Sequence, residues 1–333
     1  MKRLAGLIVG LGLLAGAGSP ESAGWLGPLH TSPAAHRGTL VIHGAGDVWL
    51  DPTHVRALRH PGAALAWSGL EGLFRRDDVT IINLECPVSL LGSPVPKAFT
   101  FRCDPSALPA MRAAGVEVAN LGNNHAYDYG PEALLDTRRN VAGAGIVPVG
   151  VGKDITEATR PALLHVEGWT VAVLGFDEVV DGVEWVAARA HPGTACGYDE
   201  ECILTSIRGA AAVADLVVID IHWGVDFDTR PREWQVQQAH RFIEAGADVI
   251  FGGHSHRLQP MEIYRGRPIF YSLGNLLWPR FSRAESRTAI AEVVVTPDGR
   301  IHGRLIPTYI ASDGHPVLGS QGIGIPKRPL HNS

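Results

Sequence analysis

The chain has 333 residues, of which 45% are apolar and 19% are charged. These proportions are typical of a globular protein with a sizeable core. Between its two ends the sequence has no fixed-period repeat and no low-complexity block, which excludes a repeat architecture. The formal net charge of −5 lacks the basic signature of nucleic-acid binding, so we expect no nucleic-acid partner.

The N-terminus predicts a targeting segment. Lys2 and Arg3 supply positive charge, the apolar residues 4–14 follow, and small residues suited to cleavage come next. The apolar run is about half the ~20 residues that a membrane-spanning helix needs. We therefore expect a signal peptide over residues 1–23 and an exported protein (secreted, periplasmic or at the cell surface). If the signal is not cleaved, it would act as an anchor. Residues 24–37 are rich in Gly, Pro and Ser and are expected to form a flexible lead.

Strands and helices are predicted to alternate over the first half of the chain. Apolar runs predict strands at residues 39–45, 79–83 and 116–121. Helical patterns lie at residues 53–75, 105–114 and 131–144. Asp104 and Pro105 suit the N-cap and first position of the second helix, and Gly143 and Gly145 suit the end of the third.

The second half begins with a predicted hairpin and ends in strands. Strands at residues 165–166 and 170–176 flank a Glu167-Gly168 turn, and a long surface loop follows over residues 177–201. Two helix–strand pairs come next, at residues 203–214 with 216–221 and at residues 231–245 with 248–251. The remaining predicted strands are residues 261–264, 268–273, 289–296 and 301–307, the last two joined by a Pro297-Asp298-Gly299 turn.

This order predicts an α/β protein whose sheets are layered with helices outside. Candidate ligands come from both halves and no linker separates the halves, so we predict a single domain over residues 38–311. Residues 312–333 are rich in Gly, Pro and polar residues and are expected to form a loosely ordered C-terminal tail.

Four cysteines, an even count in a chain predicted to be exported, indicate two disulfides. Three pairings are possible, and we favour the sequential one, Cys86 with Cys103 and Cys196 with Cys202, because it closes two short loops. Four free thiols are the alternative. A thiolate metal site is not expected because no C-x-x-C spacing occurs.

Polar side chains lie where the predicted strands end. They are Asp47, Glu85, the run Asn123-Asn124-His125, His222, and the pair His254 and His256. The carboxyl edge of an α/β sheet is where such groups converge on a ligand. Asp, Glu, Asn and His are the ligand types that divalent metals prefer, so the sequence predicts a site for one or two ions, and the mixed N/O ligands fit Mn, Fe or Zn.

Two segments carry the most specific chemistry. His254 and His256 follow two glycines that let the chain turn sharply, so both imidazoles can face one or two ions. In the other segment, Asn124 offers a neutral oxygen ligand, His125 suits a general acid, and Asp128 suits a carboxylate that orients the histidine. The alternatives are solvated loop histidines and a turn that caps the following helix. His222 alone would more often be a core histidine, and the role of Asp220 is left open.

Seven ordered segments between Gly46 and Trp278 carry a family resemblance: GDVWLDP, INLECPVS, FRCDP, NLGNNHAYDYG, IHWGVDFDTRP, AGADVIFGGHSH and PIFYSLGNLLW. This series resembles the calcineurin-like metallophosphoesterases and, within them, the CapA-type proteins associated with poly-γ-glutamate capsule synthesis and export in bacteria. The resemblance implies a four-layer α-β-β-α sandwich around a dinuclear metal centre.

The resemblance also implies residue roles. Asp47 and His256 match first-metal ligands, His222 and His254 match second-metal ligands, and Glu85 matches the bridging carboxylate. Asn124 matches the metal-binding amide and His125 the catalytic histidine. Asn275 belongs to a CapA-type motif and is a candidate for substrate binding. The chain departs from the general metallophosphoesterase pattern at Trp49, which replaces a histidine ligand, and at Glu85, which replaces an aspartate. His43 and Asp51 are the residues available to compensate.

Cationic side chains are expected on the substrate side, because a phosphate or polyglutamate ligand is anionic. Lys97, Arg102 and Arg230 are our candidates, with Arg232 and Arg257 as further ones, and solvated surface charges are the alternative.

Three functions fit this reading. The first is a metal-dependent hydrolase acting in capsule polymer synthesis or export, in which a metal-activated water attacks a phosphoester. The second is a non-catalytic protein that binds or escorts an anionic polymer beside a membrane-bound synthase, and the third is a γ-glutamyl amide hydrolase.

Overall fold

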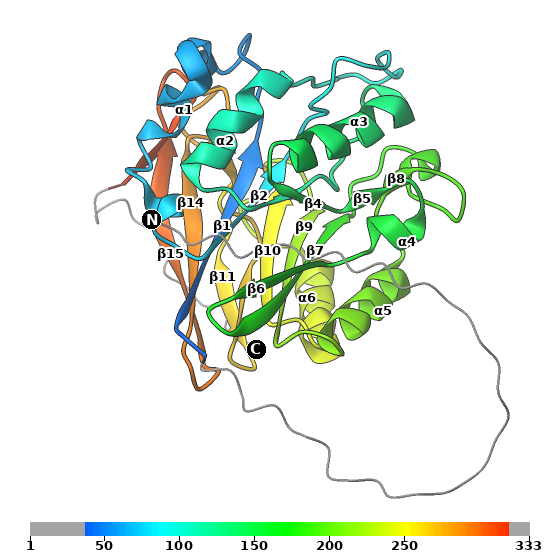
Figure 1. Cartoon of the computed structure of the whole chain (residues 1–333), viewed down its shortest axis with the longest axis vertical. Coiled ribbons are helices and arrows are strands. Elements are labelled where there is room, and N and C mark those ends of the chain that lie inside the picture. The colour runs from blue at the N-terminus through cyan, green and yellow to red at the C-terminus, as the bar shows by residue number, and fades with distance from the viewer. Residues whose placement is uncertain (1–36, 320–333) are drawn as a thin grey trace, which may run out of the picture. The chain divides into compact units, whose positions relative to one another are not determined.

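The computed structural model describes residues 37–319, so the predicted signal peptide and most of the predicted lead lie outside the described residues. Most strands belong to two large sheets (Figure 1). The first sheet has the order β16-β15-β14-β1-β2-β3-β4, with β13 paired to β1. Its strands are β1 (Leu40–Val48), β2 (Val79–Leu84), β3 (Val118–Asn120), β4 (Val147–Val149), β13 (Asn275–Leu277), β14 (Arg287–Val295), β15 (Ile301–Ile310) and β16 (Pro316–Leu318).

The second sheet has the order β11-β12-β10-β9-β7-β6. Its strands are β6 (Ala162–Val166), β7 (Trp169–Asp177), β9 (Leu216–Trp223), β10 (Val249–His254), β11 (Met261–Tyr264) and β12 (Arg267–Phe270). A small separate ladder joins β5 (Val151–Gly152) to β8 (Gly193–Thr194). The α-helices are α1 (Leu65–Ser68), α2 (Leu108–Ala114), α3 (Gly130–Gly143), α4 (Ile155–Ala158), α5 (Glu200–Ala211) and α6 (Glu233–Ala245).

The two sheets face each other across an apolar layer. Because side chains alternate along a strand, β7 sends Val171 and Val173 into the layer that also holds Leu40 and Ile42 of β1. A Cβ at Gly44 would lie 2.5 Å from the Phe251 ring, so glycine lets β1 and β10 approach closely here.

Helices cover the opposite face of each sheet. Met111 of α2 and Leu134 of α3 pack in one apolar cluster with Ile82 of β2. Ile207 of α5 and Phe242 of α6 pack in another cluster with strands β7 and β9. The predicted α/β class is therefore confirmed.

Several local predictions are confirmed. The hairpin of β6 and β7, the turn between β14 and β15, and Asp104 as the cap before α2 all occur. Both predicted disulfides form, Cys86–Cys103 and Cys196–Cys202. Within residues 37–319, no helix has the length and apolar character needed to cross a membrane.

Two predictions about local order are wrong. The helical stretch at residues 53–75 contains only α1 and three short 3-10 turns, because Pro61, Gly69 and Gly72, the last with φ +75°, interrupt any longer helix. The ordered domain also continues beyond residue 311 to β16, whereas residues 320–333 of the predicted tail lie outside the described residues. Strand β16 pairs with β15, and the Asp313 carbonyl accepts a hydrogen bond from the Ala57 amide.

Candidate metal centre

The site forms where parallel strands of both sheets end. Asp47 of β1 lies opposite Asn83 of β2 and Asn275 of β13. Glu85 follows β2, and its amide donates a hydrogen bond to the Val48 carbonyl at 2.9 Å. The second sheet supplies His222 of β9, which is paired in register with Gly253 of β10. Residues far apart in the sequence therefore converge because their strands end at neighbouring positions.

Two ligand groups share one carboxylate. Asp47, Glu85 and His256 form the first, and Glu85, His222 and His254 form the second; in each, the ligand atoms lie within 4.8 Å of one another. His222 Nε2 lies 3.4 Å from Glu85 Oε1, and His256 Nδ1 lies 3.3 Å from Asp47 Oδ2.

The predicted amide ligand is at the second group. The Oδ1 atom of Asn124 lies 2.9 Å from His222 Nε2. The structure thus brings together all six residues that the sequence predicts as metal ligands.

The buried donor atoms of this cluster fit a divalent cation. Both carboxylate oxygens of Glu85, Asp47 Oδ2 and His254 Nδ1 are buried, and none has a hydrogen-bond partner within the protein. Polar atoms in a protein interior are almost always hydrogen-bonded, and an isolated buried carboxylate is costly. A cation shared through Glu85 would satisfy these atoms, and nitrogen and oxygen donors are the set that Mn, Fe and Zn accept.

Backbone geometry makes the close packing of ligands possible. A Cβ at Gly253 would lie 2.7 Å from Asp47 Oδ1, so only glycine leaves room for the carboxylate. His254 and His256 have φ values of +84° and +51°, in the left-handed region that non-glycine residues rarely adopt. Such strain concentrates at functional sites, where the surrounding structure maintains it.

Burial and neighbouring charges shift the pKa values of several candidate ligands. Burial lowers the pKa of His254 to about 2, with the neighbouring His222 and His256 contributing, so His254 is neutral and ready to bind a metal. Burial alone would lower the pKa of His256, but Glu85 and Asp47 raise it to about 10. Burial likewise opposes the lowered pKa of Asp47, which the neighbouring His256 and His222 rings favour. Metal binding would therefore displace a proton from His256.

His125 and Asp128 lie beside the second ligand group. The Nδ1 atom of His125 lies 2.6 Å from Asp128 Oδ2, so the carboxylate fixes the orientation of the ring. The Phe101 ring stacks on His125 with 3.6 Å between centroids, and the Phe101 amide donates to Asp128 Oδ2 at 2.6 Å. His125 is buried, with 6% of its surface exposed.

Asparagines that were not predicted as metal ligands contact the candidate ligands. Asn83 Nδ2 donates to Asp47 Oδ1 at 2.7 Å and lies 3.0 Å from His222 Nδ1. Asn123 Nδ2 donates in turn to Asn83 Oδ1 at 3.0 Å. Asn275 Oδ1 lies 2.7 Å from His256 Nδ1, so the Ser272–Asn275 motif contacts a candidate ligand. The signal for Asn83 was its place at a strand end, two residues before Glu85.

Trp49, which replaces the histidine ligand of general metallophosphoesterases, is part of an aromatic stack. It is buried between His54 and Phe101, with centroid distances of 4.4 Å and 4.1 Å. Neither proposed substitute joins the ligand groups. His43 Nδ1 pairs with Asp77 at 2.8 Å, and Asp51 bonds to Thr53 and His54.

The predicted substrate-binding cations have different surroundings. Lys97 Nζ lies within 3.0 Å of Asp128 Oδ1 and within 2.9 Å of Asp181 Oδ2. The Arg102 guanidinium donates to the Leu91 carbonyl and stacks 3.5 Å above the Tyr129 ring.

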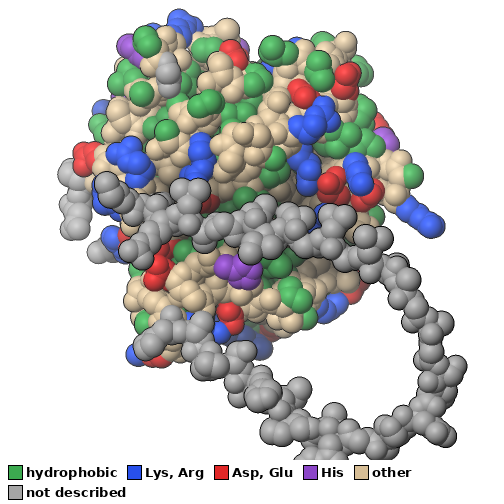
Figure 2. Space-filling model, viewed as in Figure 1, with side chains coloured by type: hydrophobic (Ala, Val, Ile, Leu, Met, Phe, Trp, Pro, Cys, Tyr) green, Lys and Arg blue, Asp and Glu red, His purple; other side chains and the backbone are tan. Residues whose placement is uncertain are grey.

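Of the remaining cations, Arg257 pairs with Glu285 at 3.1 Å, whereas Arg230 is exposed on the loop after β9. On the face seen in Figure 2, basic and acidic side chains are interspersed.

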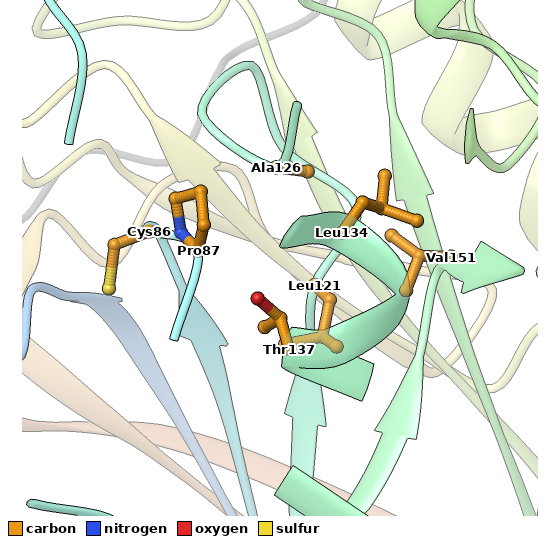
Figure 3. A pocket seen from close by; sticks show the side chains of 7 residues that line it. All are labelled: Cys86, Pro87, Leu121, Ala126, Leu134, Thr137 and Val151. Atoms are coloured by element: carbon orange, nitrogen blue, oxygen red, sulfur yellow. The ribbon is translucent and has the colours of Figure 1, made fainter. Parts of the chain in front are cut away.

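A small cavity of about 10 Å³ lies behind the loop that follows Glu85 (Figure 3). Its lining is mostly apolar: Cys86, Pro87, Leu121, Ala126, Leu134, Thr137 and Val151. The Thr137 hydroxyl donates to the Ala133 carbonyl at 2.7 Å. A space of this size holds one water at most, so it is a packing gap and not a substrate pocket.

Comparisons with known proteins agree with these motifs. A family model described as bacterial capsule synthesis protein PGA_cap matches residues 41–279. The chain is 32% identical over 252 residues to the PGA biosynthesis protein CapA of Bacillus subtilis. The matched region covers 75% of this chain and 65% of that protein. It is 34% identical over 210 residues to a probable polyglutamine synthesis accessory protein of Mycobacterium tuberculosis, covering 60% of this chain and 55% of that protein.

Among solved structures, the chain is similar to the NAD nucleotidase of Haemophilus influenzae with a TM-score of 0.49 and 15% identity, over 85% of this chain and 60% of that one. The chain spans 65% and 55% of the two curated relatives. Because the family model matches well over half of the residues, the chain belongs to the bacterial capsule synthesis family PGA_cap.

Proposed function

We propose that this protein is a metal-dependent hydrolase that cleaves a phosphoester or related bond during the synthesis or export of a poly-γ-glutamate-type capsule polymer. The observation that carries the proposal is Glu85, which belongs to both ligand groups and whose two buried carboxylate oxygens have no hydrogen-bond partner within the protein. The two facing sheets with outer helices support the four-layer sandwich of metallophosphoesterases as the fold.

The residues divide between two metal positions. Asp47, Glu85 and His256 would hold one ion, and Glu85, Asn124, His222 and His254 would hold the other. When bound, a pair of divalent ions supplies Lewis acidity and a nucleophilic water at neutral pH.

His125 is the proposed general acid. Its ring is anchored through Nδ1 on Asp128, which leaves Nε2 to donate a proton to the leaving oxygen. Phe101 covers one face of the ring and limits its rotation. Water is also excluded from that face, which strengthens the Asp128–His125 hydrogen bond.

The remaining parts of the proposal concern location and partners. Family membership supports a role in capsule polymer synthesis. We further propose an anionic capsule polymer or its phosphoester precursor as substrate and a membrane-bound polymer synthase as partner. Export would follow from cleavage of residues 1–23, and N-terminal sequencing of the protein isolated from its host tests this point.

The decisive assay measures turnover of bis(p-nitrophenyl) phosphate by the mature protein reconstituted with Mn²⁺, Fe²⁺ or Zn²⁺. We expect metal-dependent hydrolysis. We also expect His125→Ala to lower kcat by about 10²-fold or more for methyl phenyl phosphate, whose poorer leaving group needs a general acid, at unchanged metal content. Hydrolysis of γ-glutamyl peptides instead would identify an amide hydrolase. Bound metal with no turnover of either class would refute the hydrolase proposal and favour a polymer-binding role.

A further inference from the structure

We propose that Lys97, which lies within the disulfide-closed loop of residues 86–103, is a positioning residue that holds the His125–Asp128 pair, and that it is not a substrate-binding cation. This inference rests on the proposed function for the role of His125. Lys97 lies 27 residues before Asn124 and donates to its carbonyl at 2.6 Å.

The ammonium group of Lys97 is engaged within the chain. Besides the Asn124 carbonyl, it contacts Asp128 Oδ1 at 3.0 Å and Asp181 Oδ2 at 2.9 Å, and it lies 5.4 Å from the centroid of the Trp185 ring. Its side chain is 12% exposed, and that of Asp128 is fully buried. Two of its three donors bond to the Asn124 carbonyl and Asp128 Oδ1, and Asp181 Oδ2 forms an ion pair with the same ammonium, so acceptors of this chain already engage the cation.

The contacts of Asp128 show why the lysine matters to the histidine. Asp128 Oδ2 is hydrogen-bonded to the His125 ring and to the Phe101 amide, while Oδ1 accepts a hydrogen bond from Lys97. The lysine supplies the cation that a buried carboxylate needs. Without it, one carboxylate oxygen loses its partner inside the protein, which costs more than a hydrogen bond at the surface. Asp128 would then rotate or admit water, and the His125 ring would lose its fixed orientation.

The loop that carries Lys97 is anchored at both ends. Cys86, the residue after Glu85, is bonded to Cys103, and the Val95 amide donates to the Asp128 carbonyl at 2.9 Å. Lys97 and Phe101 therefore reach His125 from a segment whose ends are fixed beside a metal ligand. The geometry couples the disulfide-closed loop to the proposed general acid through two side chains.

The first test is spectroscopic and needs no turnover. A histidine Nδ1 proton bonded to a carboxylate gives a downfield proton resonance, which we would identify in the full mature protein, with and without Zn²⁺, by its loss in His125→Gln. We expect this resonance to disappear by exchange in Lys97→Met and to persist in Lys97→Arg. Lys153→Met, the same change at an exposed lysine, should leave it unchanged. An unchanged resonance in Lys97→Met, or no His125-dependent resonance in the wild type, overturns the inference.

The second test uses the leaving group. Methyl phenyl phosphate needs a general acid far more than methyl p-nitrophenyl phosphate does, because phenolate leaves less readily. We expect Lys97→Met to lower kcat by about 10-fold or more for the phenyl ester and by less than about 3-fold for the p-nitrophenyl ester, at unchanged KM. The loss should vanish when His125 is already Gln. A rise in KM with unchanged kcat would identify a substrate-binding lysine and refute the proposal. Absence of turnover in the wild type refutes the proposed function alone, since the resonance still decides the role of Lys97.

Discussion

The buried carboxyl of Glu178 predicts a measurable dependence of stability on pH. Glu178 follows β7, is 5% exposed, and accepts a hydrogen bond from Gln238 Nε2 at 2.6 Å. Burial, with added repulsion from Glu200 and Asp177, raises its pKa from the ordinary 4.5 to about 8. The folded protein therefore binds more protons than the unfolded chain between these two values, so the free energy of unfolding falls as pH rises through that window.

The magnitude follows from linkage. With a pKa of about 8 when folded and 4.5 when unfolded, this carboxyl costs about 1 kcal/mol at pH 5 and about 4 kcal/mol at pH 8. Glu178→Gln keeps an oxygen that accepts from Gln238 and removes the titration. We therefore expect the variant to gain about 3 kcal/mol over the wild type between pH 5 and pH 8, measured by urea unfolding in a chelator.

The control is Glu132→Gln, which changes an exposed carboxyl in the first turn of α3. Its stability difference from the wild type should stay nearly constant across the same pH range. An equally constant difference for Glu178→Gln would show that Glu178 is ionised in the folded protein throughout, and the reasoning from burial would be wrong.

Two further predictions concern the site and the loop beside it. Gly253→Ala should displace the Asp47 carboxylate, because the added Cβ would lie 2.7 Å from Asp47 Oδ1. We expect a loss of metal affinity of about 10- to 100-fold in calorimetric titration, as when a metal ligand loses a supporting contact. Unchanged affinity would contradict the close approach of Gly253 to Asp47. Replacing Cys86 and Cys103 by Ala opens a loop of sequence separation 17 and should cost about 3 kcal/mol of stability. The same double variant should lower kcat more than metal content, because the loop carries Phe101 and Lys97 to His125. A loss of stability with unchanged kcat would show that the disulfide-closed loop does not influence the site.

The sequence predicted the elements whose signal is local. Apolar runs located β1, β2, β9 and β10. The polar residues at the ends of these strands are the candidate ligands that the structure brings together, because parallel strands end at a common edge. The disulfides were found for a related reason, since short loops between paired cysteines need few long-range contacts. The prediction of a helix over residues 53–75 was wrong because its apolar pattern is helical but Pro61, Gly69 and Gly72 interrupt the helix.

Contacts between distant segments could not be predicted. The sequence predicts substrate binding for Lys97, and it contains no local signal of the Asn124 and Asp128 contacts that the structure shows. Its contacts with Asn124 and Asp128 depend on how the loop of residues 86–103 folds back over β3. Trp49 likewise carried a family signal of a missing ligand, but only the fold shows the aromatic stack that fills its place. Strands β13 and β16 are three residues each, too short for periodicity to indicate.

The most direct test of the account is the metal content of the purified mature protein after reconstitution, measured by elemental analysis with His254→Ala and His256→Ala alongside. The shared Glu85 predicts about two ions per chain in the wild type. Each variant should lose the ion of its own ligand group, leaving about one. No bound ion in the wild type after exposure to Mn²⁺, Fe²⁺ and Zn²⁺ would contradict the central claim that these buried strand ends form a metal centre.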